Sequence, residues 1–584
     1  MLKLSRYLKG YLKESVLSPI FKLLEAAFEL LVPLVVADII DRGIAGNDRG
    51  YIYGRGALLV AMGLVGLCSA VTAQYYSSKA AAGFGTALRD DLFRHIMGLS
   101  RAETDGIGQA TLVTRMTSDS NQIQNGVNMF FRLVLRSPFI VFGAMLMAYR
   151  IKGDEGLLFT GVICALFVIV FFIMRSTVKL YRSVQKKLDG LLLKTSENLE
   201  GVRVIRAFRR EEPEKAAYRS AAEDLAGEQV RVGRISALMN PLTYAAVNLG
   251  LAAVLRTGAV HVDAGDLTQG QVVALVNYIS QILVELIKLA NLIILLAKAS
   301  ACAKRINEVF AVQNSMEDGT LDAAARRCDP DFAAAEPSVE FRNVGFAYPG
   351  AASESVSDIS FRAAPGETVG IIGGTGSGKT TIANLIPRFY DAGRGEVVIG
   401  GRNVREYTVR SLRKLVGIVE QNARLFSGTI GDNLRWGGGT AGDGELTQAA
   451  RTAQAADVIA SKEKGLGSAV EQSGKNFSGG QKQRLSIART LAGKPRILIL
   501  DDSSSALDFA TDAALRKAIR SDCAGATVFL ISQRVATIRN ADRILVLDDG
   551  RMAGCGSHAE LLKSCGLYRE ICLSQLSEKE ALGA

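Results

Sequence analysis

Six long apolar stretches in the first part of the chain limit its fold more than any other feature. They cover residues 16–40, 56–82, 130–149, 157–174, 237–260 and 272–297. Each is close to or above the roughly 20 residues that an α-helix needs to cross the hydrocarbon core of a bilayer. Backbone polar groups must be paired inside lipid, so these stretches are expected to be helical. The sequence therefore predicts an all-α membrane domain with six spans.

The composition agrees with a membrane protein and argues against other classes. Hydrophobic residues make up 48 % of the 584 residues, and the formal net charge is +11. Nucleic-acid binding is one source of such a charge, but here the lysines and arginines lie beside apolar stretches. We therefore expect no nucleic-acid partner. The eight cysteines and three histidines have no metal-ligand spacing, which indicates reduced thiols and isolated imidazoles.

The long connections after the second and fourth stretches are basic and helical in pattern. Residues 175–215 are rich in lysine and arginine, whereas the short connections carry few. By the positive-inside rule, the long connections and the N-terminus face the cytoplasm. Six crossings then return the chain to the cytoplasm near residue 300.

Ionisable residues inside the expected spans need partners or a function, because charge in lipid is costly. Three pairs lie three or four residues apart: Glu25 with Glu29, Arg132 with Arg136, and Glu285 with Lys288. We expect the two arginines to snorkel to the interface or to pair with the glutamates. The two glutamates of the first span are either a cation-attracting patch or partners of the arginines or Lys288.

A change in composition divides the chain into two domains. Residues 312–337 are rich in Asp, Ala, Arg and Pro and show no periodicity, so they are interpreted as a linker. Alternating strand-like and helix-like segments follow, which indicates an α/β domain. We predict a membrane domain at 1–311 and a nucleotide-binding domain at 338–584.

The segment GGTGSGKTT fits the phosphate-binding loop G-x-x-x-x-G-K-[ST], with a strand before it and a helix after it. Its backbone N–H groups are expected to cradle the phosphates of ATP at a helix N-terminus. Lys379 would reach the β and γ phosphates, and Thr380 would bind Mg²⁺. The residues of this loop that we expect to hold the nucleotide are Gly373, Gly374, Thr375, Gly376, Ser377, Gly378, Lys379, Thr380 and Thr381.

Two further segments carry nucleotide chemistry. The apolar strand RILIL leads into Asp501, whose carboxylate is expected to be the second ligand of the Mg²⁺ site beside Thr380. The segment FSGGQ offers a hydroxyl and backbone N–H groups at a helix start, a second surface for phosphate. Its contacting residues are expected to be Ser478, Gly479, Gly480 and Gln481. One phosphate loop does not need this surface, so it is expected to serve the nucleotide of another subunit.

With these motifs together, the chain resembles the ATP-binding-cassette (ABC) transporters, specifically exporter-type half-transporters with six spans and one cassette. The resemblance covers essentially the whole chain and implies a P-loop α/β cassette with a helical subdomain. It implies that Tyr348 stacks on adenine and that Gln421 contacts Mg²⁺ and the membrane domain. It also implies that 119–123 and 208–212 are coupling helices that dock onto cassettes. In the family, the phosphate loop and the strand that ends in aspartates are called the Walker motifs, and FSGGQ is called the signature. Two cassettes enclose two ATP molecules, each between the Walker motifs of one cassette and the signature of the other.

Two positions depart from the family pattern, and both are catalytic. Asp502 stands where the family usually has the glutamate that activates water, and Gln533 stands where it usually has a histidine near the γ-phosphate. With Gln421, these form the expected catalytic set. An aspartate places its carboxylate about 1 Å short, which can cost roughly 10²-fold in rate. A glutamine cannot become cationic, and losing such a contact costs about 10²–10³-fold.

These features predict the degenerate half of a heterodimeric exporter of a hydrophobic or amphipathic substrate. Its partners would be a second half-transporter with intact catalytic Glu and His, membrane lipid and the substrate. The compact layout favours a prokaryotic plasma membrane with the cassette in the cytoplasm. A slow homodimer, an ATP-binding regulatory subunit and an exporter-fold importer of a siderophore-like compound remain alternatives.

Overall fold

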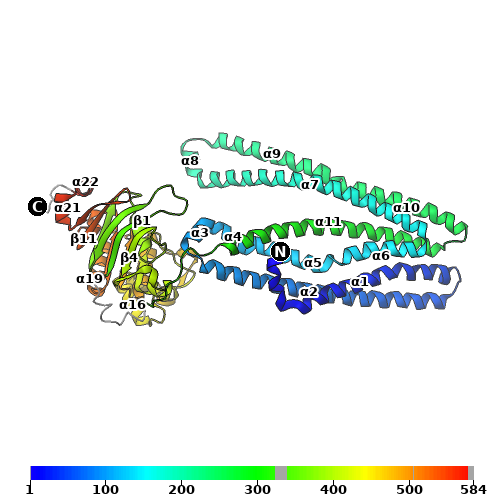
Figure 1. Cartoon of the computed structure of the whole chain (residues 1–584), viewed down its shortest axis with the longest axis horizontal. Coiled ribbons are helices and arrows are strands. Elements are labelled where there is room, and N and C mark those ends of the chain that lie inside the picture. The colour runs from blue at the N-terminus through cyan, green and yellow to red at the C-terminus, as the bar shows by residue number, and fades with distance from the viewer. Residues whose placement is uncertain (1, 323–337, 504, 577–584) are drawn as a thin grey trace. The chain divides into compact units, whose positions relative to one another are not determined.

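The computed structural model describes residues 2–322, 338–503 and 505–576, which form two compact units (Figure 1). One unit contains the chain up to Met97 together with Ala110–Ala311. The other contains Gly98–Gln109 and the chain from Val312 onward. Most of the expected linker, 323–337, lies outside the described residues, so the domain limits stay predictions.

The first unit is built from long helices because its sequence consists of long apolar stretches joined by polar turns. Its principal helices are α1 (Leu12–Asp38), α2 (Arg49–Gly98), α5 (Ser120–Leu133), α6 (Arg136–Ile151), α7 (Gly153–Glu200), α9 (Glu211–Ala237), α10 (Met239–Asp263) and α11 (Gln269–Ala311). Shorter helical segments complete it: η1 (Leu2–Tyr11), η2 (Ile39–Ile44), α4 (Gln109–Thr114), η3 (Arg115–Asp119) and α8 (Val202–Ala207). In Figure 1, α7 and α9 run side by side and are joined through α8.

Five helical segments among the described residues are long and apolar enough to cross a membrane. They contain the second to sixth apolar stretches expected from the sequence: Arg49–Gly98, Gln109–Ile151, Gly153–Glu200, Glu211–Asp263 and Gln269–Ala311. The first stretch forms α1, which carries Lys22, Glu25 and Glu29 in its middle. Its role as a sixth span stays a prediction, and its charges need partners inside the unit.

Arg136 provides one of those partners, and the expectation that it snorkels to the interface is wrong. It begins α6, and its guanidinium donates to Glu285 on α11 at 2.5 Å and to Glu29 on α1 at 2.7 Å. Glu25 lies 3.7 Å away. The alternative of interhelical pairing is confirmed for Arg136, because three carboxylates satisfy its charge inside the unit, where it is buried.

The second unit contains two larger sheets and a group of helices. A six-stranded sheet has the order β12-β11-β3-β10-β9-β6, parallel except for β12, and a four-stranded antiparallel sheet has the order β2-β1-β4-β5. The strands of the six-stranded sheet are β3 (Thr368–Gly373), β6 (Val416–Val419), β9 (Ile497–Asp501), β10 (Thr527–Ile531), β11 (Arg543–Asp548) and β12 (Arg551–Gly556). The others are β1 (Val339–Phe346), β2 (Val356–Ala363), β4 (Arg394–Ile399), β5 (Arg402–Asn403), and the short pair β7 (Gly428–Thr429) and β8 (Ala469–Val470). This is the α/β cassette that the sequence predicts.

The central strands have few polar residues because helices and the second sheet cover both faces. Every residue of β9 and β10 is buried, as is typical of parallel strands inside an α/β layer. The helices of this unit are α3 (Arg101–Ile107), α13 (Lys379–Leu385), α14 (Val409–Leu415), α15 (Ile430–Gly438), α16 (Asp443–Thr452), α17 (Ala456–Ala460), α18 (Gly479–Ala492), α19 (Phe509–Asp522), α20 (Val535–Ile538), α21 (His558–Ser564) and α22 (Gly566–Gln575). Helices α15, α16 and α18 pack together as the predicted helical subdomain.

Candidate nucleotide site

The phosphate loop connects β3 to α13, as its motif predicts. Gly378 has φ +94° at the N-cap of α13, a left-handed conformation that favours glycine. A Cβ at Gly378 would also stand 2.5 Å from a methyl carbon of Val356. The loop therefore needs a glycine at this position to turn tightly enough to aim backbone N–H groups at one point.

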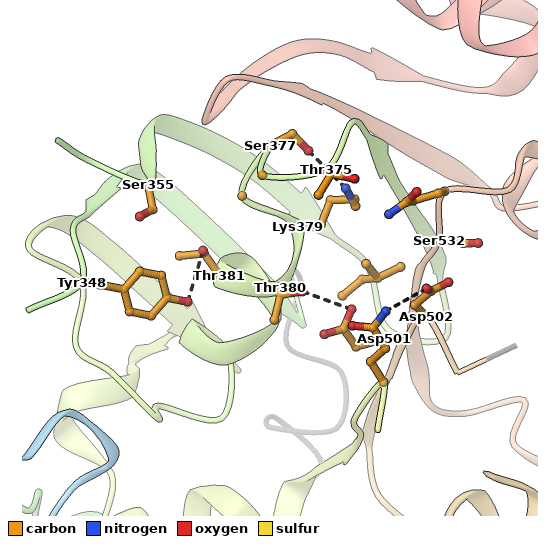
Figure 2. Close-up of a pocket in the computed structure, with 15 residues that line it drawn as sticks. Tyr348, Ser355, Thr375, Ser377, Lys379, Thr380, Thr381, Asp501, Asp502 and Ser532 are labelled. Atoms are coloured by element: carbon orange, nitrogen blue, oxygen red, sulfur yellow. Dashed lines mark hydrogen bonds between the residues drawn. The ribbon is translucent and has the colours of Figure 1, made fainter. Parts of the chain in front are cut away.

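Lys379 lies at the centre of this loop. Its ammonium donates to the carbonyl oxygens of Gly373, at 2.9 Å, and Gly374. Its nitrogen also lies 3.3 Å from the Ser377 hydroxyl (Figure 2). Burial lowers the pKa of Lys379, and the carboxylates of Asp501 and Asp502 act in the opposite direction. The side-chain nitrogen thus lies between backbone carbonyl oxygens and two nearby carboxylates.

Two adjacent carboxylates face the loop from the end of β9. The Thr380 hydroxyl donates to Asp501 at 3.4 Å, and the Gln421 amide donates to Asp502 at 3.2 Å (Figure 2). Burial is the largest cause that raises the pKa of each aspartate above its usual range. Asp502 has φ +43°, an uncommon conformation for a residue with a side chain. The backbone therefore directs successive carboxylates to different parts of one site.

These groups line a cavity of about 420 Å³. Most of the expected own-chain site residues are brought together there: Tyr348, Thr375, Gly376, Ser377, Gly378, Lys379, Thr380, Thr381, Gln421, Asp501, Asp502 and Gln533. Gly373 and Gly374 contribute through their carbonyl contacts with Lys379. The sequence reasoning missed Ser355, Ile531 and Ser532 as lining residues. Ile531 and Ser532 directly precede Gln533 at the end of β10, so the end of this strand could have indicated that they line the cavity. No sequence motif marks Ser355.

Tyr348 is held at one side of the cavity by aromatic packing. Its ring makes edge contacts with Phe346 and Tyr390, with centroids 4.9 and 5.2 Å apart. Its hydroxyl lies 3.3 Å from that of Thr381 (Figure 2). The ring is therefore fixed beside the phosphate loop, and its stacking on adenine stays a prediction.

The signature segment is outside this cavity. Ser478 caps α18 in a reciprocal arrangement: its hydroxyl accepts from the Gln481 N–H at 3.3 Å, and the Gln481 side chain accepts from the Ser478 N–H at 3.0 Å. Ser478 and Gly479 are exposed, and Gly480 is partly exposed. The helix start is thus rigid and open to solvent, although none of the four expected residues lines the chain's own nucleotide cavity.

A short helix from the membrane half of the sequence packs against the cassette. In α3, Asp105 accepts a 2.7 Å hydrogen bond from Tyr390, and the Arg101 guanidinium lies 5.2 Å from the ring centre of Phe389. Burial and Asp105 raise the pKa of Tyr390, so its phenol stays protonated and can donate. Arg101 also lies 3.4 Å from Glu420, next to Gln421.

This contact corrects the first expected coupling helix. The cassette-docked segment is 101–107, whereas 119–123 belongs to the first unit, where Asp119 and Ile123 are buried. Asp119 there accepts hydrogen bonds from Arg305 and Arg115. The second expected segment, 208–212, falls at the turn between α8 and α9 and stays a prediction.

Comparison with known proteins decides the family. Residues 15–286 match the family described as ABC transporter transmembrane region, and residues 356–505 match the one described as ABC transporter. An uncharacterized ABC transporter ATP-binding protein of Mycobacterium tuberculosis is 36 % identical over 578 residues, covering 98 % of this chain and 97 % of that protein. The chain belongs to the ABC transporter family.

Two other relatives place this ABC transporter among the exporters. An ATP-dependent lipid A-core flippase of Pseudomonas fluorescens is 31 % identical, covering 87 % of this chain and 83 % of that protein. The solved structure of a bacterial Atm1-family ABC exporter with ATP bound is 27 % identical, with a TM-score of 0.79 and coverage of 98 % and 99 %. The predictions of an exporter-type fold, a membrane location with a cytoplasmic cassette, ATP binding and ATPase activity are confirmed.

The α3 contact yields a first prediction. Changing Tyr390→Phe removes the hydrogen bond to Asp105, and a bond to a charged group contributes about 1.5–3 kcal/mol. Amide hydrogen exchange in Arg101–Ile107 should therefore speed up by about tenfold or more. The matched control is Tyr348→Phe, which removes the contact with Thr381 and should leave exchange in α3 unchanged. Equal exchange in both variants would contradict the role given to Tyr390.

Proposed function

We propose that this chain is the degenerate half of a heterodimeric ABC exporter. Its own Walker site would bind Mg·ATP and hydrolyse it poorly, and its signature would complete a competent site on a partner. The observation that carries this proposal is the presence of Asp502 and Gln533 in a cavity whose binding residues are otherwise complete. Binding and hydrolysis use different groups here, so one can persist while the other is weak.

The metal side of the site fits Mg²⁺. The Thr380 hydroxyl and the Asp501 carboxylate lie within 3.4 Å of each other, and both are hard oxygen ligands. Gln421 lies in the same cavity. These three residues would hold the ion, which would neutralise charge on the phosphates. Because burial raises the pKa of Asp501, metal binding also favours the ionised form that the fold alone disfavours.

Asp502 is poorly suited to act as a general base. Its carboxylate already accepts the Gln421 amide, and its shorter side chain reaches less far from the backbone than a glutamate would. A misplacement of about 1 Å at a reacting group can cost roughly 10²-fold in rate. The position keeps a charge next to Mg·ATP but loses the reach that water activation requires.

Gln533, on another side of the cavity, is also expected to slow ATP hydrolysis. It follows β10, and its main-chain carbonyl accepts a 2.8 Å hydrogen bond from Gln575. This bond fixes the backbone, so the side chain enters the cavity from a defined position. A neutral amide can contact a phosphate but cannot add positive charge as the transition state forms.

The intact signature argues that the chain still takes part in hydrolysis by the assembled transporter. The capped start of α18 presents Ser478, Gly479 and Gly480 to solvent. A helix N-terminus with open N–H groups binds phosphate well. Such a surface away from the chain's own cavity is useful if a partner's nucleotide docks there.

The first unit also supports an assembly of two half-transporters. Large apolar side chains are exposed on α7 and near the α8 turn, including Leu193 at 62 %, Leu199 at 71 % and Phe208 at 75 %. They lie on the basic segment expected in the cytoplasm, where lipid cannot cover them. Exposed apolar patches of this kind typically mark protein interfaces.

The proposed cargo is a hydrophobic or amphipathic compound. The relative from Pseudomonas fluorescens is named a lipid A-core flippase, which is an amphipath-handling function. A regulatory subunit explains the weak site but leaves the docked α3 and the intact signature without a purpose. An exporter-fold importer of a siderophore-like compound is separated from the exporter by the direction of ATP-driven flux in inverted vesicles.

The purified chain without its partner should bind ATP analogues but hydrolyse ATP near background. Lys379, Thr380 and Asp501 retain the binding contacts, while Asp502 and Gln533 slow the chemistry. Equilibrium binding of a fluorescent nucleotide and phosphate release from the same preparation measure both properties. Turnover of roughly 1 s⁻¹ or faster, as in ordinary enzymes, would contradict the proposal.

In the assembled transporter, Ser478→Arg should remove most ATPase activity. The larger side chain would fill the space where the partner's γ-phosphate is expected, while the chain's own cavity, which Ser478 does not line, should still bind nucleotide. The matched control is Ser461→Arg, an exposed serine of the same subdomain outside the signature. If both variants keep the wild-type rate, the composite-site assignment is wrong.

A double-mutant cycle tests whether Asp502 and Gln533 disable one step. With the partner's catalytic glutamate removed to silence the other site, Asp502→Glu plus Gln533→His should gain more than the two single changes combined. Both groups act on one transition state, so their effects should be coupled. ATPase rates of the four proteins give the coupling directly. Additive effects, or full activity from Asp502→Glu alone, would refute the shared-step explanation.

A further inference from the structure

An alternating chain of charges links three helices of the membrane unit. Glu29 on α1 accepts from Arg136 on α6 at 2.7 Å, and Arg136 donates through its other terminal nitrogen to Glu285 on α11 at 2.5 Å. Glu285 also accepts from Lys288 at 2.8 Å. The order of charge is therefore negative, positive, negative, positive, and the two ends have opposite signs.

The middle of this chain is buried and its ends are open. The side chains of Arg136 and Glu285 are 9 % and 3 % exposed, whereas those of Glu29 and Lys288 are 40 % and 42 % exposed. Glu285 has an additional donor in the Ser137 hydroxyl at 2.7 Å. A buried ion pair contributes little net stability compared with apolar packing. Ionisable groups at membrane depth are therefore strong indicators of a functional site.

An unpaired hydrogen-bond acceptor, the Gln281 side-chain oxygen, lies beside Glu29 at the negative end of the charge chain. The Gln281 side chain donates through its nitrogen to the Glu29 carbonyl at 3.4 Å. That bond fixes the orientation of the amide, and its buried oxygen has no hydrogen-bond partner among the described residues. A buried acceptor without a donor costs free energy, so this position suits a ligand that carries N–H groups.

The two open ends are close enough for one headgroup to approach both. Gln281, Glu285 and Lys288 recur at spacings of four and three residues, which places them on one face of α11. The path from the Glu29 carboxylate to the Lys288 ammonium consists of three hydrogen bonds, of 2.7, 2.5 and 2.8 Å, and the width of the Arg136 guanidinium. The Glu29 carboxylate and the Lys288 ammonium are therefore on the order of 10 Å apart or closer.

The geometry points to a binding site for an amphipath with a zwitterionic headgroup. The ligand's ammonium group would bind the Glu29 carboxylate and the Gln281 oxygen, and its phosphate or carboxylate group would bind Lys288. The apolar tail would lie along the surrounding helices. This inference rests on the proposed export of an amphipathic substrate and names the headgroup chemistry of that substrate.

The same arrangement selects against headgroups with a single sign of charge. A purely cationic headgroup attracted to Glu29 meets Lys288 and Arg136, and a purely anionic one attracted to Lys288 meets Glu285 and Glu29. Repulsion of this kind provides specificity in addition to attraction. The neighbouring pair Lys22 and Glu25 is already joined at 2.5 Å and needs no ligand.

A binding experiment on the full-length chain in an uncharged maltoside detergent tests the site. Three fluorescent probes with the same single C12 tail carry a phosphoethanolamine, a trimethylammonium or a phosphate-monoester headgroup. The zwitterionic probe should bind at least about fivefold tighter than either other probe. Equal affinities for all three would overturn the inference. Nucleotide hydrolysis is not measured, so failure here is distinguishable from failure of the heterodimer proposal.

Two single variants test the assigned ends. Glu29→Gln and Lys288→Gln should each weaken binding of the zwitterionic probe by about five- to tenfold, as expected for one partly solvated ionic contact. Lys288→Gln should also strengthen binding of the cationic probe, and Glu29→Gln that of the anionic probe. A purely structural role would not reverse selectivity in this way.

The matched controls are Asp90→Asn and Arg94→Gln, which alter an exposed ion pair on α2 outside the proposed site. They should leave all three affinities unchanged, and nucleotide binding by every variant confirms that the chain is folded. Wild-type-like selectivity in Glu29→Gln and Lys288→Gln would overturn the inference.

A competition experiment identifies the source of the headgroup. Displacement of the zwitterionic probe by a two-tailed phosphoethanolamine lipid would identify a bilayer lipid, and no displacement would identify a single-tailed compound. Both outcomes support the site.

Discussion

The parallel pairing of β10 between β3 and β9 is the constraint on which the nucleotide site depends. Ile531 is opposite Ile371 on one side and Asp501 on the other. This register brings the phosphate loop after β3, the carboxylates at the end of β9 and Gln533 after β10 to one edge of the sheet. Ligands typically bind at the carboxyl ends of such strands. A shift in this register would separate groups that must meet around one phosphate.

The parts of the site that sequence reasoning predicted are those controlled by local chain geometry. The phosphate loop needs glycine at position 378 for a left-handed turn, and Lys379 and Thr380 then occupy fixed places at the start of α13. The apolar run before Asp501 predicts a buried strand by composition alone. Long apolar stretches predict membrane helices for the same reason, because lipid imposes a minimum length that is visible in the sequence.

The parts that were not predicted depend on contacts between residues far apart in the sequence. The sequence leaves both snorkelling and pairing with a glutamate open for Arg136, because nothing near it indicates that Glu285, 149 residues away, accepts its hydrogen bond. The family resemblance implies a docked helix at 119–123, and no pattern in the sequence shows which turn of the long connection meets the cassette. The deciding contact joins Asp105 to Tyr390, a pair that no local pattern connects.

The proposed weakness of the chain's own ATP site rests on a division of labour among its residues. In this proposal, phosphate and metal binding depend on backbone N–H groups, Lys379, Thr380 and Asp501, which the fold positions without help from Asp502 or Gln533. Water activation is expected to depend on those two side chains together with Gln421, whose amide donates to Asp502. A substitution at either position can therefore lower the rate of hydrolysis while the loop, the strand register and the capped signature helix are kept. A site of the proposed kind would hold ATP as part of a dimer interface, so selection on assembly would preserve it even with little catalytic power.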